Sequence, residues 1–540
     1  MLHRNRVVQV ARSRFACAGA LVVAFSSAAC GSADESFEEV RTVQAAFNAN
    51  DPIHVCNQDP RVWMGLVPLQ VCAGARVFFD ETFDGNGRTC GTCHDAANNY
   101  TVDSKFVAAL PANDPLFVAD DPNFDLELLE LPDLRGPLAL IRENVDGFED
   151  LEFKFVGRSV THTISLATSI ARDPGDGTSA DFAERTGWGG DGAPGDGSLR
   201  SFLDGAINQH YPKDSSRTPG VSFRFATEAE KDQTLAFQLA VGRTADLNLA
   251  SVVLNDGGAA QGRNDFLDPM RGRCNHCHAN AGANFVPTGL NRNFDTGTTE
   301  APSSFIELPG GGFLFDGGFG GQGLEEPNHV TVTGVPDAFG DGTFSTPPLI
   351  EAADTGPFFH THVFGDVFEP TNGIEGAVGF YSSALFTNSP AAQELDAFFG
   401  APIDLSGSAV QDIGRFLRVL NASFNLAQAI QRLQATHTLV VAFWGYREDI
   451  QKGLIELADE EVEDAIRVLS FGVETGGGNL HPAQQATLIN ARALLAAALA
   501  TTNPAVRRDK AAAARAAIQT AKNGLGTGMN FQLGTGNLMF

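Results

Sequence analysis

The chain has 540 residues, of which 43% are hydrophobic and 41 are Phe, so it has enough apolar side chains for the cores of about two to four domains. This composition excludes a disordered chain. The formal net charge of -28 argues against binding to nucleic acid, whose phosphates need clustered Lys and Arg.

The first thirty residues have the layout of an export signal. Four Arg precede an apolar run at residues 15–24, which is too short to span a bilayer, and small residues follow. Residues 27–31 resemble a lipoprotein box with Cys30 as the lipid site, and simple cleavage nearby is the alternative. We therefore expect a periplasmic protein that touches the outer membrane only through an anchor at Cys30, with residues 31–60 as a tether.

Two Cys-x-x-Cys-His sequences carry the chemistry of the chain. The cysteines are Cys90, Cys93, Cys274 and Cys277, and the histidines are His94 and His278. In this pattern both thiols attach to one porphyrin and the adjacent His becomes an axial iron ligand. Zinc sites built from Cys-x-x-Cys pairs are the alternative, but these pairs do not require a His after each one. The two motifs predict two covalently bound c-type haems.

Two further cysteines, Cys56 and Cys72, remain outside the signal and the haem motifs. In an oxidising periplasm they can form a disulfide, and the alternative is two unrelated thiols.

Five segments occur in a recognisable order around the haem motifs. They are residues 75–89 (ARVFFDETFDGNGRT), 158–166 (RSVTHTISL), 293–297 (NFDTG), 344–349 (FSTPPL) and 356–360 (GPFFH). With the haem motifs, these segments resemble the bacterial dihaem cytochrome c peroxidases of the MauG superfamily, over roughly residues 70–420. The resemblance implies two cytochrome c domains with one haem each.

The expected fold is mostly α, with two cytochrome c-like haem domains, long loops and a C-terminal helical extension. The domain bounds are residues 61–243, 244–421 and 422–540. A helix is expected over residues 228–247. In the extension, helices are expected at residues 426–434, 460–470 and 481–500, followed by one that starts at Asn503-Pro504 and ends near Asn523-Gly524.

In the resembled family, the first haem reacts with peroxide and the second supplies electrons through a Trp. Trp188 is the candidate bridge, and an ordinary packed aromatic is the alternative. The family's distal Gln and Glu fall on Phe202 and near His210, so neither is retained. His210 is the candidate proton carrier, with a solvated loop His as the alternative. The family also implies a calcium ion between the haem domains.

The second haem also departs from the family pattern, because Thr346 occupies the position of the usual Met ligand. His360, His362 and Met529 are the alternatives. No His lies between His94 and His162, which predicts an open or water-filled sixth position at the first haem.

Three functions follow from these residues. The first is a peroxidase-like oxidoreductase that takes electrons from a small cytochrome or copper protein and uses hydrogen peroxide. The second is an oxygenase that cleaves an apolar, polyisoprene-like substrate with dioxygen, because Phe202 with Trp188 shortly before it resembles the dihaem rubber oxygenases. The third is an electron carrier without catalysis.

Overall fold

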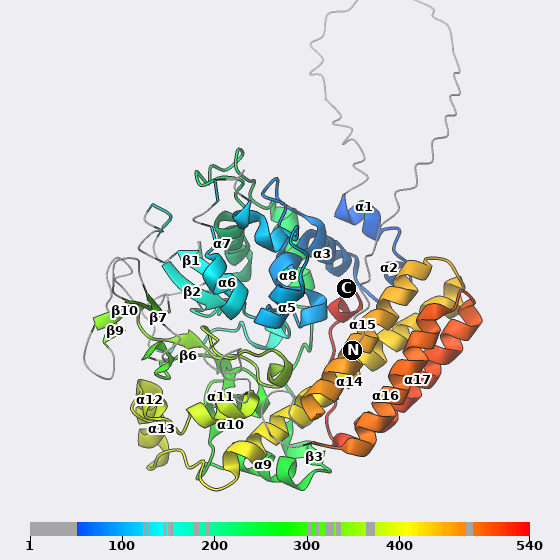
Figure 1. Cartoon of the computed structure of the whole chain (residues 1–540). Helices are drawn as coiled ribbons and strands as arrows, with labels where there is room; N and C mark the ends of the chain where they lie inside the picture. The colour runs from blue at the N-terminus through cyan, green and yellow to red at the C-terminus, as the bar shows by residue number, and fades with distance from the viewer. Residues whose placement is uncertain are drawn as a thin grey trace, which may run out of the picture. The chain divides into compact units, whose positions relative to one another are not determined.

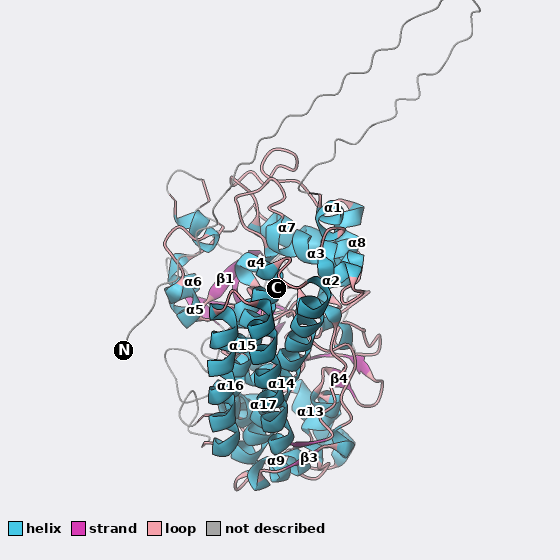
Figure 2. Ribbon diagram, turned by 90° about the vertical axis from the view of Figure 1, so that its right-hand side faces the viewer, coloured by secondary structure: helices cyan, strands magenta, loops and turns pink. Residues whose placement is uncertain are grey.

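Helices make up most of the regular structure, and the strands are short (Figures 1 and 2), which confirms the expected mostly α fold. The computed structural model describes residues 51–121, 125–126, 129–144, 147–149, 151, 155–176, 183–190, 192, 195–300, 305–307, 313–318, 329–330, 336–362, 373–470 and 479–539. Residues 1–50, with the expected export signal and Cys30, lie outside these ranges.

The first part of the chain holds eight helices and one hairpin among its described residues. The helices are α1 (Pro52–Cys56), α2 (Pro60–Trp63), α3 (Leu69–Asp80), α4 (Cys90–Cys93), α5 (Ser104–Ala109), α6 (Pro132–Leu138), α7 (Leu199–His210) and α8 (Glu228–Gln238); the antiparallel strands are β1 (Leu140–Asn144) and β2 (Phe155–Ser159). A disulfide between Cys56 and Cys72 joins α1 to α3, with the Cα atoms 5.8 Å apart. The predicted pairing is confirmed.

The second part surrounds the second motif with short elements. The helices are α9 (Gly257–Leu267), α10 (Cys274–Cys277), α11 (Ile374–Phe380), α12 (Ala384–Thr387) and α13 (Pro390–Phe399). The strands are β3 (Val253–Leu254), β4 (Asn284–Phe285), β5 (Leu290–Asn291), β6 (Asn293–Phe294), β7 (Phe305–Glu307), β8 (Phe313–Gly317), β9 (His329–Val330), β10 (Pro336–Gly340) and β11 (Phe344–Ser345). Strands β7, β8, β10 and β9 form a four-stranded sheet in that order, and the others pair two by two.

Four long helices complete the fold and lie side by side in Figure 2. They are α14 (Ala409–Phe443), α15 (Glu448–Leu469), α16 (Pro482–Ala500) and α17 (Pro504–Leu525), followed by β12 (Gly526–Thr527). Helix α14 packs against α9 and α11 of the second part as well as α15 and α17. The expected domain boundary at residue 421 lies inside α14, and residues 49–540 form one compact unit.

Two helix ends illustrate how local signals and long-range contacts compete. The Asn503 side chain caps α17, as predicted, by accepting hydrogen bonds from the backbone amides of Ala505 and Val506. The helix expected over residues 228–247 instead ends at Gln238. That prediction is wrong because the chain turns at Gly242, where φ is +75° and an added Cβ would lie 2.5 Å from the Ser165 hydroxyl.

The C-terminal segment returns to the first part of the chain. The Asn537 side chain accepts a hydrogen bond from the Gly242 amide (2.6 Å) and donates one to the Gly242 carbonyl (3.0 Å). Arg61, which is buried beside Asp59, donates to the Leu538 carbonyl (2.6 Å). The end of the chain therefore joins the helical extension to the first-motif region.

Candidate functional site

The first Cys-x-x-Cys-His motif forms a single helical turn. Thr89 and Thr92 form a capping box, and the His94 amide donates to the Cys90 carbonyl (2.9 Å). Nδ1 of His94 lies 2.8 Å from the Tyr100 carbonyl oxygen. Because Nδ1 is engaged there, Nε2 is the nitrogen that remains to bind a metal, an arrangement that is common for metal-ligating His. Cys90 and Cys93 are free thiols.

The second motif repeats this geometry on α10. The His278 amide donates to the Cys274 carbonyl (2.9 Å). Nδ1 of His278 lies 3.2 Å from the Gly282 carbonyl oxygen and 3.1 Å from that of Pro347. Cys274 and Cys277 are also free thiols. Two segments 184 residues apart thus present the same set of atoms, a pair of thiols and one imidazole Nε2.

Burial decides the protonation states at both motifs. It lowers the pKa of His94 and of His278 to about 4, so both imidazoles are neutral at pH 7, as metal ligation requires. It raises the pKa of Cys90 and Cys93 to about 11 and that of Cys274 and Cys277 to about 12. Reactive Cys-x-x-Cys dithiols have lowered thiol pKa values, so these pairs do not resemble a thiol–disulfide redox site.

A mostly apolar cavity lies at the second motif. Its volume is about 180 Å³, counted as the space open to the centre of a water-sized sphere, and part of the cavity opens to solvent. Cys274, Cys277 and His278 line it. The wall also includes residues of four segments that carry the family resemblance, namely Val160, Phe294, Thr346 and Phe358 among others. This lining, mostly apolar with two thiols and the His278 imidazole, is of the kind that a porphyrin attached at Cys274 and Cys277 would need.

The four segments are held together by backbone hydrogen bonds. Strand β11 pairs with β6, with Phe344 opposite Phe294. The Ser159 amide donates to the His360 carbonyl (2.8 Å) and the Ser345 amide donates to the Trp188 carbonyl (2.7 Å). Segments that are far apart in the sequence therefore meet at one site.

Trp188 lies between the two parts of the chain. Its indole Nε1 donates to the Ser159 carbonyl (3.0 Å), and its own carbonyl accepts from Ser345. It also lines the cavity that contains His278. These contacts fix the side chain at the cavity of the second motif, and an ordinary packed aromatic would make the same contacts.

Phe202 and His210 both lie on α7, beside the first motif. An added Cβ at Gly187 would stand 3.1 Å from the Phe202 ring, so this ring contacts the turn that carries Trp188. His210 is the last residue of α7 and is partly buried, so it is not a solvated loop residue. Burial and then the charges of Arg88 and Arg217 lower the pKa of His210 to about 3. The imidazole is therefore a weak base at pH 7.

The four candidates for a further iron ligand at the second motif differ in their contacts and in whether they line the cavity. The Thr346 hydroxyl donates to the Arg292 carbonyl (2.7 Å), and Met529 is buried but does not line the cavity. His360 and His362 do line it. The His360 ring stacks on Phe344, with the ring centroids 3.8 Å apart. Nδ1 of His362 lies 2.8 Å from the Leu138 carbonyl oxygen, which repeats the arrangement of His94 and His278.

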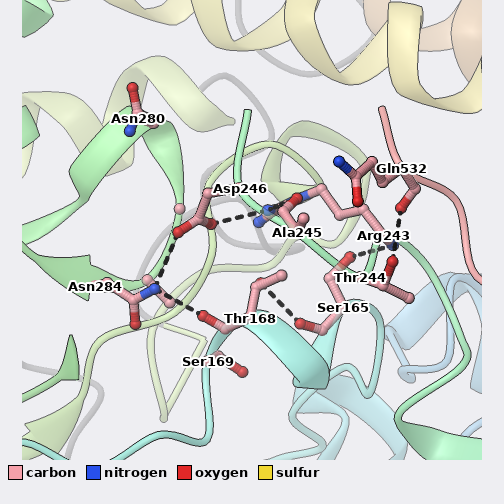
Figure 3. Close-up of polar contacts among 12 residues, drawn as sticks. Ser165, Thr168, Ser169, Arg243, Thr244, Ala245, Asp246, Asn280, Asn284 and Gln532 are labelled. Carbon is pink, nitrogen blue, oxygen red and sulfur yellow. Dashed lines mark hydrogen bonds and ion pairs between the residues drawn. The ribbon is translucent and has the colours of Figure 1, made fainter. Parts of the chain in front are cut away.

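A buried polar network joins the segments that follow the two motifs (Figure 3). The Arg243 amide donates to the Ser165 hydroxyl (2.9 Å), and its guanidinium donates to Asp246 (3.1 Å) and to Glu351 (2.7 Å). Asn284, six residues after His278, donates to Asp246 (3.1 Å) and to the Thr168 carbonyl (3.0 Å). Sequence analysis missed this network because no local pattern marks a partner that lies 108 residues away in the chain.

The described residues also bear on the expected metal sites and on membrane-spanning helices. Within the ranges given above, no group of three or more His, Cys, Asp or Glu is arranged to hold a metal ion directly. The calcium ion stays a prediction without named ligands. In the same ranges, no helix is long and apolar enough to cross a membrane.

Comparison with known proteins gives no further guide, because no family model, no curated protein and no solved structure matches the chain.

Proposed function

We propose that the chain is an exported dihaem c-type cytochrome that acts as a peroxidase-like oxidoreductase. The observation that carries the proposal is the repeated geometry of the two motifs. In each motif two partly buried thiols lie on one helical turn, and the following His holds Nδ1 on a backbone carbonyl and keeps Nε2 for a metal.

Each haem would be held by its own pair of cysteines and its own histidine. Cys90 and Cys93 would hold one haem and Cys274 and Cys277 the other, with His94 and His278 as axial ligands. When bound, each haem would supply an iron that can exchange single electrons, as a peroxidase-like reaction requires. The mostly apolar wall around His278 would give that site a low polarity.

Electrons would enter at the His278 haem from a small periplasmic cytochrome or copper protein and leave through the His94 haem. The fixed position of Trp188 supports this route, because its indole and its carbonyl connect β2 of the first part to β11 of the second. Peroxide is the oxidant that the family resemblance implies.

A second candidate is an oxygenase with an apolar substrate, and two observations favour it. General acid–base catalysis is most efficient when the pKa of the group lies near the working pH, and the pKa of His210 is far below it. Beside it, Phe202 packs on the Trp188 turn, and Val77, Phe83, Leu203, Ile207 and Phe223 form an apolar cluster against Cys90. Such surroundings suit a hydrocarbon better than proton transfer.

The deciding experiment mixes the half-reduced mature protein with hydrogen peroxide in an anaerobic stopped-flow instrument. A fast change of haem absorbance at near-stoichiometric peroxide, lost in a His210→Ala variant but kept in His481→Ala, supports the peroxidase. If peroxide gives no reaction, dioxygen is tested with polyisoprene as substrate. Cleavage supports the oxygenase, and inertness towards both oxidants with two bound haems supports the electron carrier.

A further inference from the structure

An exposed aromatic patch lies at the far end of the long helices. Six large apolar side chains there are between 41% and 61% exposed, namely Trp63, Met64, Val441, Trp444, Tyr446 and Val506. They account for almost half of the exposed large hydrophobic residues in the described ranges. Exposed apolar side chains are normal when scattered, but a contiguous group marks an interaction surface.

Contacts between three segments show that these residues form one surface, which we call the aromatic patch. Trp63 of α2 stacks on Tyr446, with the ring centroids 6.3 Å apart and the planes 9° from parallel. Trp63 also contacts Phe443, the last residue of α14 (5.8 Å). An added Cβ at Gly445 would lie 3.4 Å from Pro504, the first residue of α17 and close in sequence to Val506.

The turn between α14 and α15 holds the rings outwards. Trp444 and Arg447 both have a left-handed backbone, with φ of 54° and 52°, which is unfavourable for residues other than Gly, Asn and Asp. The Gln451 side chain fixes this turn by donating to the carbonyls of Trp444 (2.7 Å) and Tyr446 (3.2 Å). The indole of Trp63 donates to the Asn57 carbonyl (2.7 Å). The exposed aromatic rings are therefore anchored rather than free.

We propose that the aromatic patch rests on a lipid bilayer. Trp and Tyr combine an apolar ring with a polar group and concentrate at the boundary between lipid and water. The surroundings of the patch are also close to neutral. Residues 51–64, 441–452 and 504–510 together contain six Lys or Arg and five Asp or Glu, whereas the whole chain carries a net charge of -28. An anionic membrane surface thus repels this face less than it would repel a face with the average charge of the chain.

The position of the N-terminal segment supports a lipid surface over other partners. The described chain begins at Asp51, directly before α1 and α2, and α2 ends in the patch at Trp63. Twenty-one peptide bonds separate Asp51 from Cys30, so a lipid at Cys30 lies within about 75 Å of extended chain. An anchor of that reach attached beside the patch raises the effective concentration of the membrane at this face. The proposal thus rests on the proposed export, and not on the haem chemistry.

Helix α14 connects this face to the redox site. Ile413 and Leu417 of α14 line the His278 cavity, and the helix ends at Phe443 in the patch. Its 26 residues from Leu417 to Phe443 correspond to about 40 Å of helix. A protein seated on the patch would hold the second haem site at that distance from the bilayer, where a diffusing electron donor reaches it.

The test is flotation of the mature protein with vesicles of phosphatidylethanolamine and phosphatidylglycerol, using Cys30→Ser so that only the patch contributes. We expect the protein to float with the vesicles and the Trp444→Ser/Tyr446→Ser variant to bind at least about tenfold more weakly. Phe398→Ser is the matched control, since Phe398 is 64% exposed but lies on α13 and not in the patch. Its binding should be unchanged.

Two results would overturn the proposal. The first is no flotation of the Cys30→Ser protein at any lipid concentration. The second is self-association in analytical ultracentrifugation that the patch variant abolishes, since the patch would then be an interface between copies of the chain. Haem content is measured on the same samples, so that a failure of the dihaem proposal is seen separately from a failure of membrane binding.

Discussion

Replacing Arg243 with Met tests whether the network of Figure 3 holds the two motif regions together. The side chains of Arg243 and Glu351 are 0% and 1% exposed, so water cannot screen the remaining charge. In Arg243→Met the Glu351 carboxylate keeps only the hydrogen bond from the Ser165 hydroxyl (2.6 Å). Removing one partner of a buried ion pair typically costs about 3–5 kcal/mol. We therefore expect a loss of about 4 kcal/mol in the free energy of unfolding.

Urea denaturation followed by far-ultraviolet circular dichroism measures this loss. Arg508→Met is the control, because Arg508 pairs with Asp509 on the surface and such pairs contribute about 0–1 kcal/mol. The double variant Arg243→Met/Glu351→Met removes both charges and should recover at least half of the loss. If Arg243→Met and Arg508→Met lower the stability equally, the network does not have the role that we assign to it.

Three further predictions follow from the described contacts. Burial raises the pKa of Glu460 from 4.5 to about 7, so the folded protein holds a proton that the unfolded chain releases. The folded state therefore loses stability as the pH rises from 4.5 through 7. Glu460→Gln should remove about 1–3 kcal/mol of that loss in denaturation at pH 8 and have little effect at pH 4.5. The variant Cys56→Ala/Cys72→Ala opens a loop with a sequence separation of 16 and should lower the free energy of unfolding by about 3 kcal/mol. His362→Ala should change the electron paramagnetic resonance spectrum of one haem, whereas His481→Ala, outside the cavity, should not.

Each of these has a clear contrary result. An equal effect of Glu460→Gln at both pH values would show that the carboxyl does not change its protonation on folding. A cysteine variant as stable as the unchanged protein would mean that the disulfide does not limit the unfolded chain. An unchanged spectrum in His362→Ala would leave His360 as the cavity residue to replace next.

Local patterns predicted the parts of the molecule that depend on neighbouring residues. The cap at Asn503 and the mostly helical fold both follow from short stretches of sequence. The disulfide needed only two cysteines and an oxidising compartment.

Features that depend on distant residues could not be predicted in this way. The end of α8 at Gln238 depends on the turn at Gly242 beside Ser165, and the buried ion pair of Arg243 joins residues 108 positions apart. The position of His362 on the cavity wall depends on the Leu138 carbonyl, 224 positions away. No periodicity or motif in the sequence contains such information.

The measurement that tests the central claim most directly is the number of covalently bound haems per chain. The mature protein, produced in a host with a c-type maturation system, is examined by the pyridine haemochrome spectrum and by intact-protein mass spectrometry. We predict two haems, and one in each of the variants Cys90→Ala/Cys93→Ala and Cys274→Ala/Cys277→Ala. A chain that carries no haem and whose four motif thiols all react with an alkylating reagent after unfolding would contradict the dihaem proposal.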